Sequence, residues 1–97
     1  MSEGNLPDWL TEEDDGSMTV SFADLKNKPK LDGTEVSSLT MREPTVADEL
    51  AIEKIKSVGE RESQAIANLT EQSPEAIRGL TMRQYGRLQD AYGVFLG

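Results

Sequence analysis

The chain has 97 residues, 36% hydrophobic and only 5% aromatic, with a formal net charge of −8 at pH 7, which fits one small domain with a modest core. It contains no cysteine and no histidine, which excludes disulfides, thiolate metal sites and the commonest general base and zinc ligand. No apolar run approaches the roughly 18 residues that span a bilayer, and the acidic start is unlike a signal peptide, so we expect a cytoplasmic protein.

Residues 1–16 predict a disordered acidic tail. They contain six Asp and Glu residues and no Lys or Arg, so they carry −6 of the formal charge and residues 17–97 carry −2. Within the tail, Leu6, Trp9 and Leu10 can form a short apolar face. One interpretation is a linear motif that folds on a partner with Trp9 as its anchor. The alternative is a solvated tail in which the tryptophan packs locally.

Two strands are predicted between residues 17 and 44. In Ser17–Leu25, apolar residues alternate with Thr and Ser, as in a half-buried strand. Asp32-Gly33 marks a tight turn. The second strand runs over Thr34–Arg42, and because Val36 is out of phase with the later apolar residues, we expect a bulge near Ser37 or Ser38.

Residues 26–30 read Lys-Asn-Lys-Pro-Lys, a basic patch that contains a proline. Its interpretation as a charged sheet edge that prevents strand aggregation is favoured over an anion site.

Helices are predicted from residue 45 onward. Pro44 stops the strand, and Thr45 with Asp48 three residues later has the spacing of a capping box. The first helix should run from about Val46 to Ser57 and end at Gly59. Its predicted inward face consists of Ala47, Leu50, Ala51, Ile55 and Val58.

Three further helices follow in the sequence. One is expected over residues 60–71, and a short one begins at Ser73-Pro74, with Ser as cap and Pro at the first helical position. Thr81 and Gln84 form a second capping box that opens the last helix, which extends to about Leu96.

The last helix carries the clearest apolar stripe of the chain, Tyr85, Leu88, Tyr92 and Phe95, with Met82, Ala91 and Leu96 alongside. The stripe predicts either the core of the domain itself or a partner-binding helix whose distal half, from Tyr92 to Leu96, extends outward. The candidate partner-binding residues are therefore Tyr85, Leu88, Tyr92, Phe95, Leu96 and Trp9.

Together these elements predict an α+β fold. A small N-terminal antiparallel β-hairpin or meander packs against a C-terminal bundle of three to four short helices. The predicted organisation is a disordered tail over residues 1–16 and a single domain over 17–97, with strands in 17–44 and helices in 45–97.

No catalytic constellation is recognisable. The adjacent carboxylates Asp14 with Asp15 and Asp48 with Glu49 point apart on a strand or helix, and no motif positions a nucleophile beside a base. Glycine-rich phosphate loops are absent from the sequence. The acidic balance also argues against binding to a nucleic-acid backbone. We expect a non-enzymatic binding or assembly protein without cofactor or metal.

From Val20 to Gly97, the chain resembles the small tail assembly chaperones of Mu-like contractile-tailed phages and prophages. The segments that carry the resemblance are the hairpin with Asp32-Gly33, Leu39 to Thr45 with Arg-Glu-Pro-Thr, the Ala-Asp-Glu-Leu-Ala-Ile-Glu-Lys helix, Leu69 to Leu80 with Ser73-Pro74-Glu75, and Tyr85-Gly86-Arg87-Leu88-Gln89 to Phe95-Leu96-Gly97. The Arg-Glu-Pro-Thr junction is the most specific segment. The acidic tail with Trp9 lies outside the resemblance.

The resemblance implies a chaperone that binds the tape measure protein in the host bacterial cytoplasm, keeps it soluble before the tail tube polymerises, and is missing from the mature virion. Further implied partners are the tail tube protein and a frameshift-extended form of the chain itself. Such families often make this longer product by a minus-one ribosomal shift. Val94-Phe95-Leu96 can be encoded by GTT-TTT-TTG, which contains the slippery run T-TTT-TTG.

Two other classes of function remain open from the sequence. An acidic regulatory or inhibitory adaptor, such as a nucleic-acid mimic or an antitoxin-like partner, would lose binding when residues 1–16 are deleted. A minor structural subunit of the tail would be found in purified particles.

Overall fold

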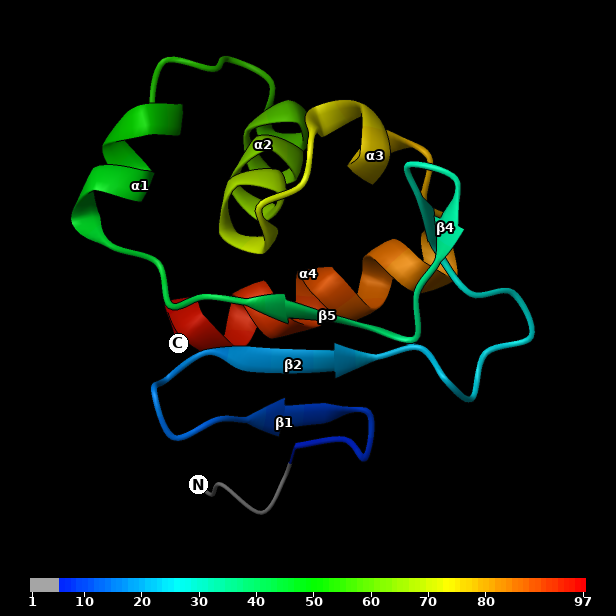
Figure 1. Cartoon of the computed structure of the whole chain (residues 1–97). Helices are drawn as coiled ribbons and strands as arrows, with labels where there is room; N and C mark the ends of the chain where they lie inside the picture. The colour runs from blue at the N-terminus through cyan, green and yellow to red at the C-terminus, as the bar shows by residue number, and fades with distance from the viewer. Residues whose placement is uncertain (1–5) are drawn as a thin grey trace.

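The computed structural model describes residues 6–97 as strands followed by helices, which confirms the predicted α+β class (Figure 1). The strands are β1 (Leu10–Glu12), β2 (Met18–Ser21), β3 (Lys30–Leu31), β4 (Thr34–Glu35) and β5 (Ser38–Met41). The helices are α1 (Val46–Ile52), α2 (Val58–Thr70), α3 (Pro74–Arg78) and α4 (Met82–Leu96). Within residues 6–97, none of the helices has the length and apolar character needed to cross a membrane.

The main sheet has the order β1-β2-β5, and both pairings are antiparallel. Val20 lies at the centre of this sheet, opposite Leu10 on one side and Leu39 on the other, and all three side chains are buried. The alternation predicted for residues 17–25 therefore holds over β2, where Met18 and Val20 face the core and Thr19 and Ser21 are partly exposed.

The tail prediction fails between residues 10 and 12, where the chain forms β1 instead of a disordered segment. Leu10 is only 4% exposed, and the amide of Ser21 donates a 2.8 Å hydrogen bond to the carbonyl of Trp9. Burial of Leu10 removes apolar surface from water, and pairing with β2 gives the backbone groups of β1 hydrogen-bond partners. Together these gains outweigh the repulsion among the nearby acidic side chains. Residues 1–5 of the predicted tail lie outside the described residues.

The single strand predicted over Thr34–Arg42 is two strands, β4 and β5, which belong to different sheets. β4 pairs with β3 through a turn in which Asp32 and Gly33 have φ of 53° and 80°, as a type I′ hairpin requires. β5 pairs with β2. The phase change at Val36 thus marks a change of strand partner and not the bulge that we expected.

The first helix is shorter than predicted. It ends at Ile52, and Gly59 lies within α2, whose first turn is capped by the Ser57 hydroxyl accepting from the amide of Glu60 at 3.3 Å. Of α1, only Ile52 is buried. The prediction that Leu50 and Val58 point inward is therefore wrong, because the chain turns away after Ile52 and leaves no element to cover them.

Helices α2 and α4 complete the core by packing on the sheet, α2 against β5 and α4 against β2. The largest fully buried side chains come from both layers, namely Phe22, Met41, Ile66, Leu69, Leu88, Val20 and Pro29. The amide of Arg42 donates to the carbonyl of Leu69 at 3.0 Å, so the end of β5 is tied to the end of α2.

Both predicted capping boxes form. Thr45 and Asp48 exchange side-chain to backbone hydrogen bonds at the start of α1, and Thr81 and Gln84 do so at the start of α4. The Gln84 amide also donates to the carbonyl of Asn27 at 2.9 Å, which connects α4 to the loop after β2.

Candidate partner-binding surface

Exposed apolar side chains from three helices gather beside two hollows where α1, the start of α2 and the end of α4 meet. Two adjoining hollows of about 320 and 390 Å³ share one wall there. We call this surface the α1–α2–α4 groove, and its main lining residues are Glu49, Leu50, Ile52, Val58, Arg61, Tyr92, Gly93 and Leu96. In Figure 1, the C-terminal end of α4 lies below α1, and α2 stands to the right of α1.

Three large apolar side chains of the groove face solvent. Leu50 is 58% exposed, Val58 73% and Leu96 58%. They come from three different helices, and the two hollows that they line share Glu49, Ile52 and Arg61. Apolar surface gathered beside a hollow is typical of a protein–protein interaction site.

Helix α1 is held in place from its N-terminal side by an ion pair. The guanidinium of Arg42 donates to both carboxylate oxygens of Asp48, at 2.7 and 2.8 Å. The same carboxylate accepts from the amide of Thr45 at 2.7 Å. The hydrogen bonds from Arg42, and then those from Thr45, hold the pKa of Asp48 well below its usual range.

A second contact holds α1 to α4. The hydroxyl of Tyr92 donates to the carboxylate of Glu49 at 3.0 Å. Burial, followed by this hydrogen bond to an ionised group, raises the pKa of Tyr92 to about 12. The phenol therefore remains a donor at physiological pH.

Arg61 supports the loop between α1 and α2. Its Nε and Nη2 atoms donate to the carbonyl of Ile55 at 3.0 and 2.9 Å. These bonds satisfy a carbonyl in the loop after α1 and fix the path of the chain toward Val58. The hydrogen bonds of Arg61 thus hold this side of the groove in place, although few of the apolar side chains of the groove are buried.

The surface continues along α2 and α4 through a polar cluster centred on Glu62. Its carboxylate accepts from the hydroxyl of Tyr85 at 2.9 Å and from the amide of Gln89 at 2.8 Å. Burial and then the hydrogen bond to Glu62 raise the pKa of Tyr85. Beyond Tyr85, a smaller hollow of about 210 Å³ is lined by Gly59, Ser63, Ile77, Arg78, Leu80, Met82 and Tyr85.

The six predicted partner-binding residues do not form one surface in the structure. Leu88 is fully buried and Tyr92 is 7% exposed, so both belong to the core, although Tyr92 also lines the groove. Tyr85 and Phe95 are partly buried, and Leu96 lies in the groove. Trp9 lines neither hollow of the groove and packs against Arg87, whose guanidinium carbon lies 4.9 Å from the ring centroid.

Leu50 and Val58 were not predicted as surface residues, because the helical periodicity assigned both to a buried helix face. One local signal was available. Ser57 followed by Glu60 has the spacing of a capping box, which predicts that a new helix starts at Val58. A helix start there shortens the preceding helix and removes Val58 from its inward face.

The groove offers apolar contact, hydrogen-bonding groups and carboxylates. Over residues 6–97, no cluster of three or more acidic side chains is arranged to hold a metal ion. The exposed apolar side chains of the groove suit it to bind an apolar surface of another molecule.

A comparison with known protein families gives a match. A family model described as phage tail assembly chaperone proteins, E, or 41 or 14, matches residues 24–97. The matched region contains every residue of the α1–α2–α4 groove, whereas β1, β2 and Trp9 precede it. Neither the curated proteins nor the solved structures contain a match to the chain.

Proposed function

The chain belongs to the phage tail assembly chaperone proteins, and we propose that it binds the tape measure protein of its phage and keeps it soluble while the tail is built. In this role the protein acts without catalysis, in the cytoplasm of the host bacterium. It leaves before the tail is complete, so it is missing from the finished virion.

The observation that supports the proposal most is the exposed apolar surface of the α1–α2–α4 groove. A tape measure protein is long and mostly helical, and its apolar stripes aggregate when they are uncovered. An amphipathic helix can place such a stripe against Leu50, Val58 and Leu96. Burial of one side chain of this size contributes roughly 1.5–3 kcal/mol at most. Association itself costs several kcal/mol, so three such side chains leave a weak net affinity for one groove, and we expect many copies to bind along one partner.

Charge supports the same role. The chain carries −8, and the carboxylates of Glu49, Glu53 and Glu62 lie in or beside the groove. A bound copy covers an apolar stripe and adds negative charge to the complex, and like charges on neighbouring complexes oppose aggregation.

The proposed partners include the tail tube protein and a frameshift-extended form of this chain. Val94-Phe95-Leu96 ends helix α4, so a shift at these codons would attach further sequence beside the groove. The gene sequence tests this part alone. GTT-TTT-TTG keeps the slippery run, whereas codons such as GTC or CTG remove it.

Co-expression with the tape measure protein tests the proposal. We expect the tape measure protein to move from the insoluble to the soluble fraction and to co-purify with this chain. The double variant Leu50→Ser, Val58→Ser should lose most of this effect. Val94→Ser is the matched control, since Val94 is exposed on α4 and does not line the groove. The proposal would be overturned if the tape measure protein stayed insoluble when it is co-expressed with the wild-type chain, and also when the frameshift-extended product is present.

A further inference from the structure

One face of α4 lines hollows at both ends of the helix. Met82, Tyr85, Gln89, Tyr92 and Leu96 follow one another at intervals of three or four residues, so they form a single stripe. Met82 and Tyr85 line the hollow of about 210 Å³, and the other three residues line the α1–α2–α4 groove. A helix rises about 1.5 Å per residue, so the stripe extends over about 21 Å.

Helix α2 borders the same stripe. Val58 and Glu62 line the groove, and Ser63 lines the small hollow. Glu62 also connects the two hollows, because its carboxylate accepts hydrogen bonds from Gln89 on the groove side and from Tyr85 on the side of the small hollow. We call the surface that runs from the α1–α2–α4 groove to the small hollow the α2–α4 track.

The groove end of the track is acidic. Glu49, Glu53 and Glu62 line it together with one basic residue, Arg61, which gives this end a formal charge of −2. The hydrogen bonds that Glu49 and Glu62 accept come from neutral hydroxyl and amide groups, and the guanidinium of Arg61 donates to backbone carbonyls. These contacts therefore do not pair the carboxylates with a positive charge.

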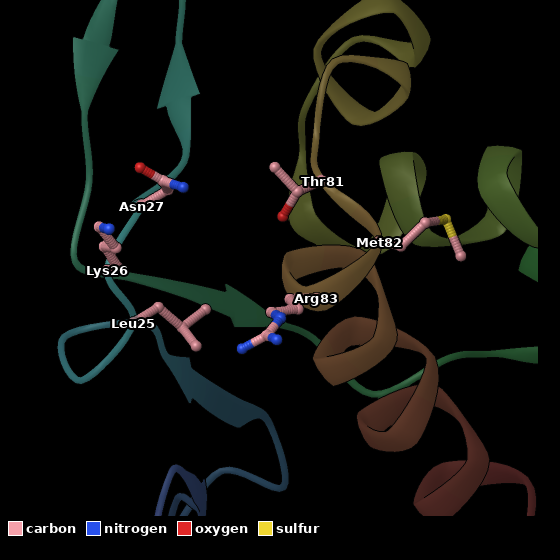
Figure 2. Close-up of a pocket in the computed structure, with 6 residues that line it drawn as sticks. All are labelled: Leu25, Lys26, Asn27, Thr81, Met82 and Arg83. Atoms are coloured by element: carbon pink, nitrogen blue, oxygen red, sulfur yellow. The ribbon is translucent and has the colours of Figure 1, made fainter.

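The other end of the track is basic. Arg78 lines the small hollow, and Met82 is shared with a further hollow of about 430 Å³ that Lys26 and Arg83 line from opposite sides (Figure 2). Among residues 6–97, no acidic residue lines either of these two hollows. The three basic residues are exposed, and they take part in neither salt bridge formed within that range.

Exposed apolar side chains lie at both ends of the track. Val58 and Leu96 are 73% and 58% exposed at the acidic end, and Met82 is 74% exposed at the basic end. A helix that covers all three needs an apolar residue every three or four positions over about four turns, which is the length of the stripe. The track therefore fits an amphipathic helix.

We propose that the α2–α4 track binds one amphipathic helix whose charges are segregated. Lys or Arg lies at the end of this helix that meets the groove, and Asp or Glu lies at the end that meets the start of α4. The inference rests on the proposed function and names the kind of tape measure segment that the chain binds. Charges of opposite sign at the two ends of the track fix the direction of the bound helix, and a helix of uniform charge is rejected because one of its ends meets like charge.

Two fluorescein-labelled peptides of about 18 residues, long enough to cover the stripe, test the charge pattern. They share one apolar stripe and one composition. In the segregated peptide, Glu occupies the first turns and Lys the last turns, and in the mixed peptide the same residues alternate along the polar face. Fluorescence anisotropy gives the Kd of each. We expect the wild type to bind the segregated peptide about ten-fold more tightly, since a few exposed ion pairs together give this ratio.

Charge-reversed variants separate the track from other charged surfaces. Glu53→Lys with Arg78→Glu reverses one charge at each end of the track, and we expect the ratio of the two Kd values to fall to about one. Glu12→Lys with Lys30→Glu is the matched control, since both residues line none of these hollows, and it should keep the wild-type ratio. All four positions are exposed, and circular dichroism checks that the variants fold.

Comparing the ratio between proteins removes any difference in helicity between the free peptides. Direction is measured with a photoreactive amino acid at either end of the segregated peptide. We expect the Lys end to cross-link to α1 or to the end of α4, and the Glu end to cross-link to α3 or to the start of α4.

A wild-type ratio near one, an unchanged ratio in Glu53→Lys with Arg78→Glu, or cross-links from both peptide ends to the same end of the track would overturn the proposal. The proposed function has its own test, because the co-expression result does not depend on how charges are arranged on the partner. Conversely, a tape measure protein that stays insoluble would remove that partner and leave binding of the segregated peptide to stand.

Discussion

The hydroxyl of Tyr92 lies 3.0 Å from the carboxylate of Glu49 and donates a hydrogen bond to it across the α1–α2–α4 groove. This bond joins the last helix to the least buried helix of the fold. Because α1 buries only Ile52, its position depends on this contact and on the ion pair between Arg42 and Asp48. The geometry of the groove therefore rests on a few polar contacts.

Tyr92→Phe removes the hydroxyl and keeps the ring. We expect the free energy of unfolding to fall by about 0.5–1.5 kcal/mol, as for a typical buried hydrogen bond. Hydrogen exchange should become faster in α1 than elsewhere, because the hydroxyl is one of the few contacts that fix this helix. Tyr85→Phe is the control, since it loses a bond to Glu62 and should leave the exchange of α1 unchanged. Equal exchange of α1 in both variants would show that the Tyr92 hydroxyl does not anchor it.

The ion pair of Arg42 with Asp48 should make stability depend on acidity. The pKa of Asp48 is lowered in the folded protein from 3.8, so the unfolded chain binds its proton more readily. Stability therefore holds above about pH 4, the unfolded value, and is lost as pH falls further toward the folded value. The pKa of Asp24, lowered to about 2 by its hydrogen bond from Arg87, acts in the same direction.

Asp48→Asn should therefore be less stable than the wild type at pH 7, by about 1 kcal/mol from the weakened cap. The difference should shrink as pH falls toward 2, because the unfolded wild type then takes up a proton at Asp48 that the folded protein resists, whereas the asparagine of the variant does not titrate. Urea unfolding of both proteins at a series of pH values from 7 to 2 measures this difference in the free energy of unfolding. A difference that stays constant with pH would mean that the Asp48 carboxylate contributes no charge-dependent stability.

Arg87 links the N-terminal strand to α4 through three partners. Its guanidinium donates to both oxygens of Asp24 at 2.7 and 2.9 Å and to the carbonyl of Ser21 at 2.8 Å, and it lies over the ring of Trp9. We expect Arg87→Ala to lower the free energy of unfolding by about 1–3 kcal/mol, since it removes charge-assisted hydrogen bonds and a cation–π contact.

The fluorescence of Trp9 should also shift toward that of a solvated tryptophan in Arg87→Ala at low denaturant. Arg83→Ala is the matched control on the same helix, because Arg83 is exposed and takes part in neither of the salt bridges formed within residues 6–97. Equal stability of the two alanine variants would show that the link between Trp9, Asp24 and α4 is not stabilising.

Local features of the sequence predicted the fold well. The capping boxes at Thr45 and Thr81 form as expected, because a cap needs only residues three positions apart. β1 was missed because Leu10 becomes ordered only by pairing with Val20, which is distant in the sequence and outweighs local acidity. No local composition signal reports such a pairing.

The groove was harder to predict than the fold. Periodicity shows that Leu50 lies on an apolar helix face, but it does not show whether the chain itself covers that face. Leu88 belongs to the predicted stripe of the last helix and Leu96 was predicted alongside it, yet Leu88 is fully buried and Leu96 is 58% exposed. The difference is set by where α2 and the sheet end, which is a property of the tertiary structure.

Site-specific photo-cross-linking to the tape measure protein is the most direct test of the central claim that the α1–α2–α4 groove binds this partner. A photoreactive amino acid is placed at Leu50, at Leu96, or at the control position Glu35, which is exposed on β4 away from the groove. We predict cross-links to the tape measure protein from positions 50 and 96 and none from position 35. Cross-links from position 35 alone, or none from either groove position in a complex that co-purifies, would contradict the account.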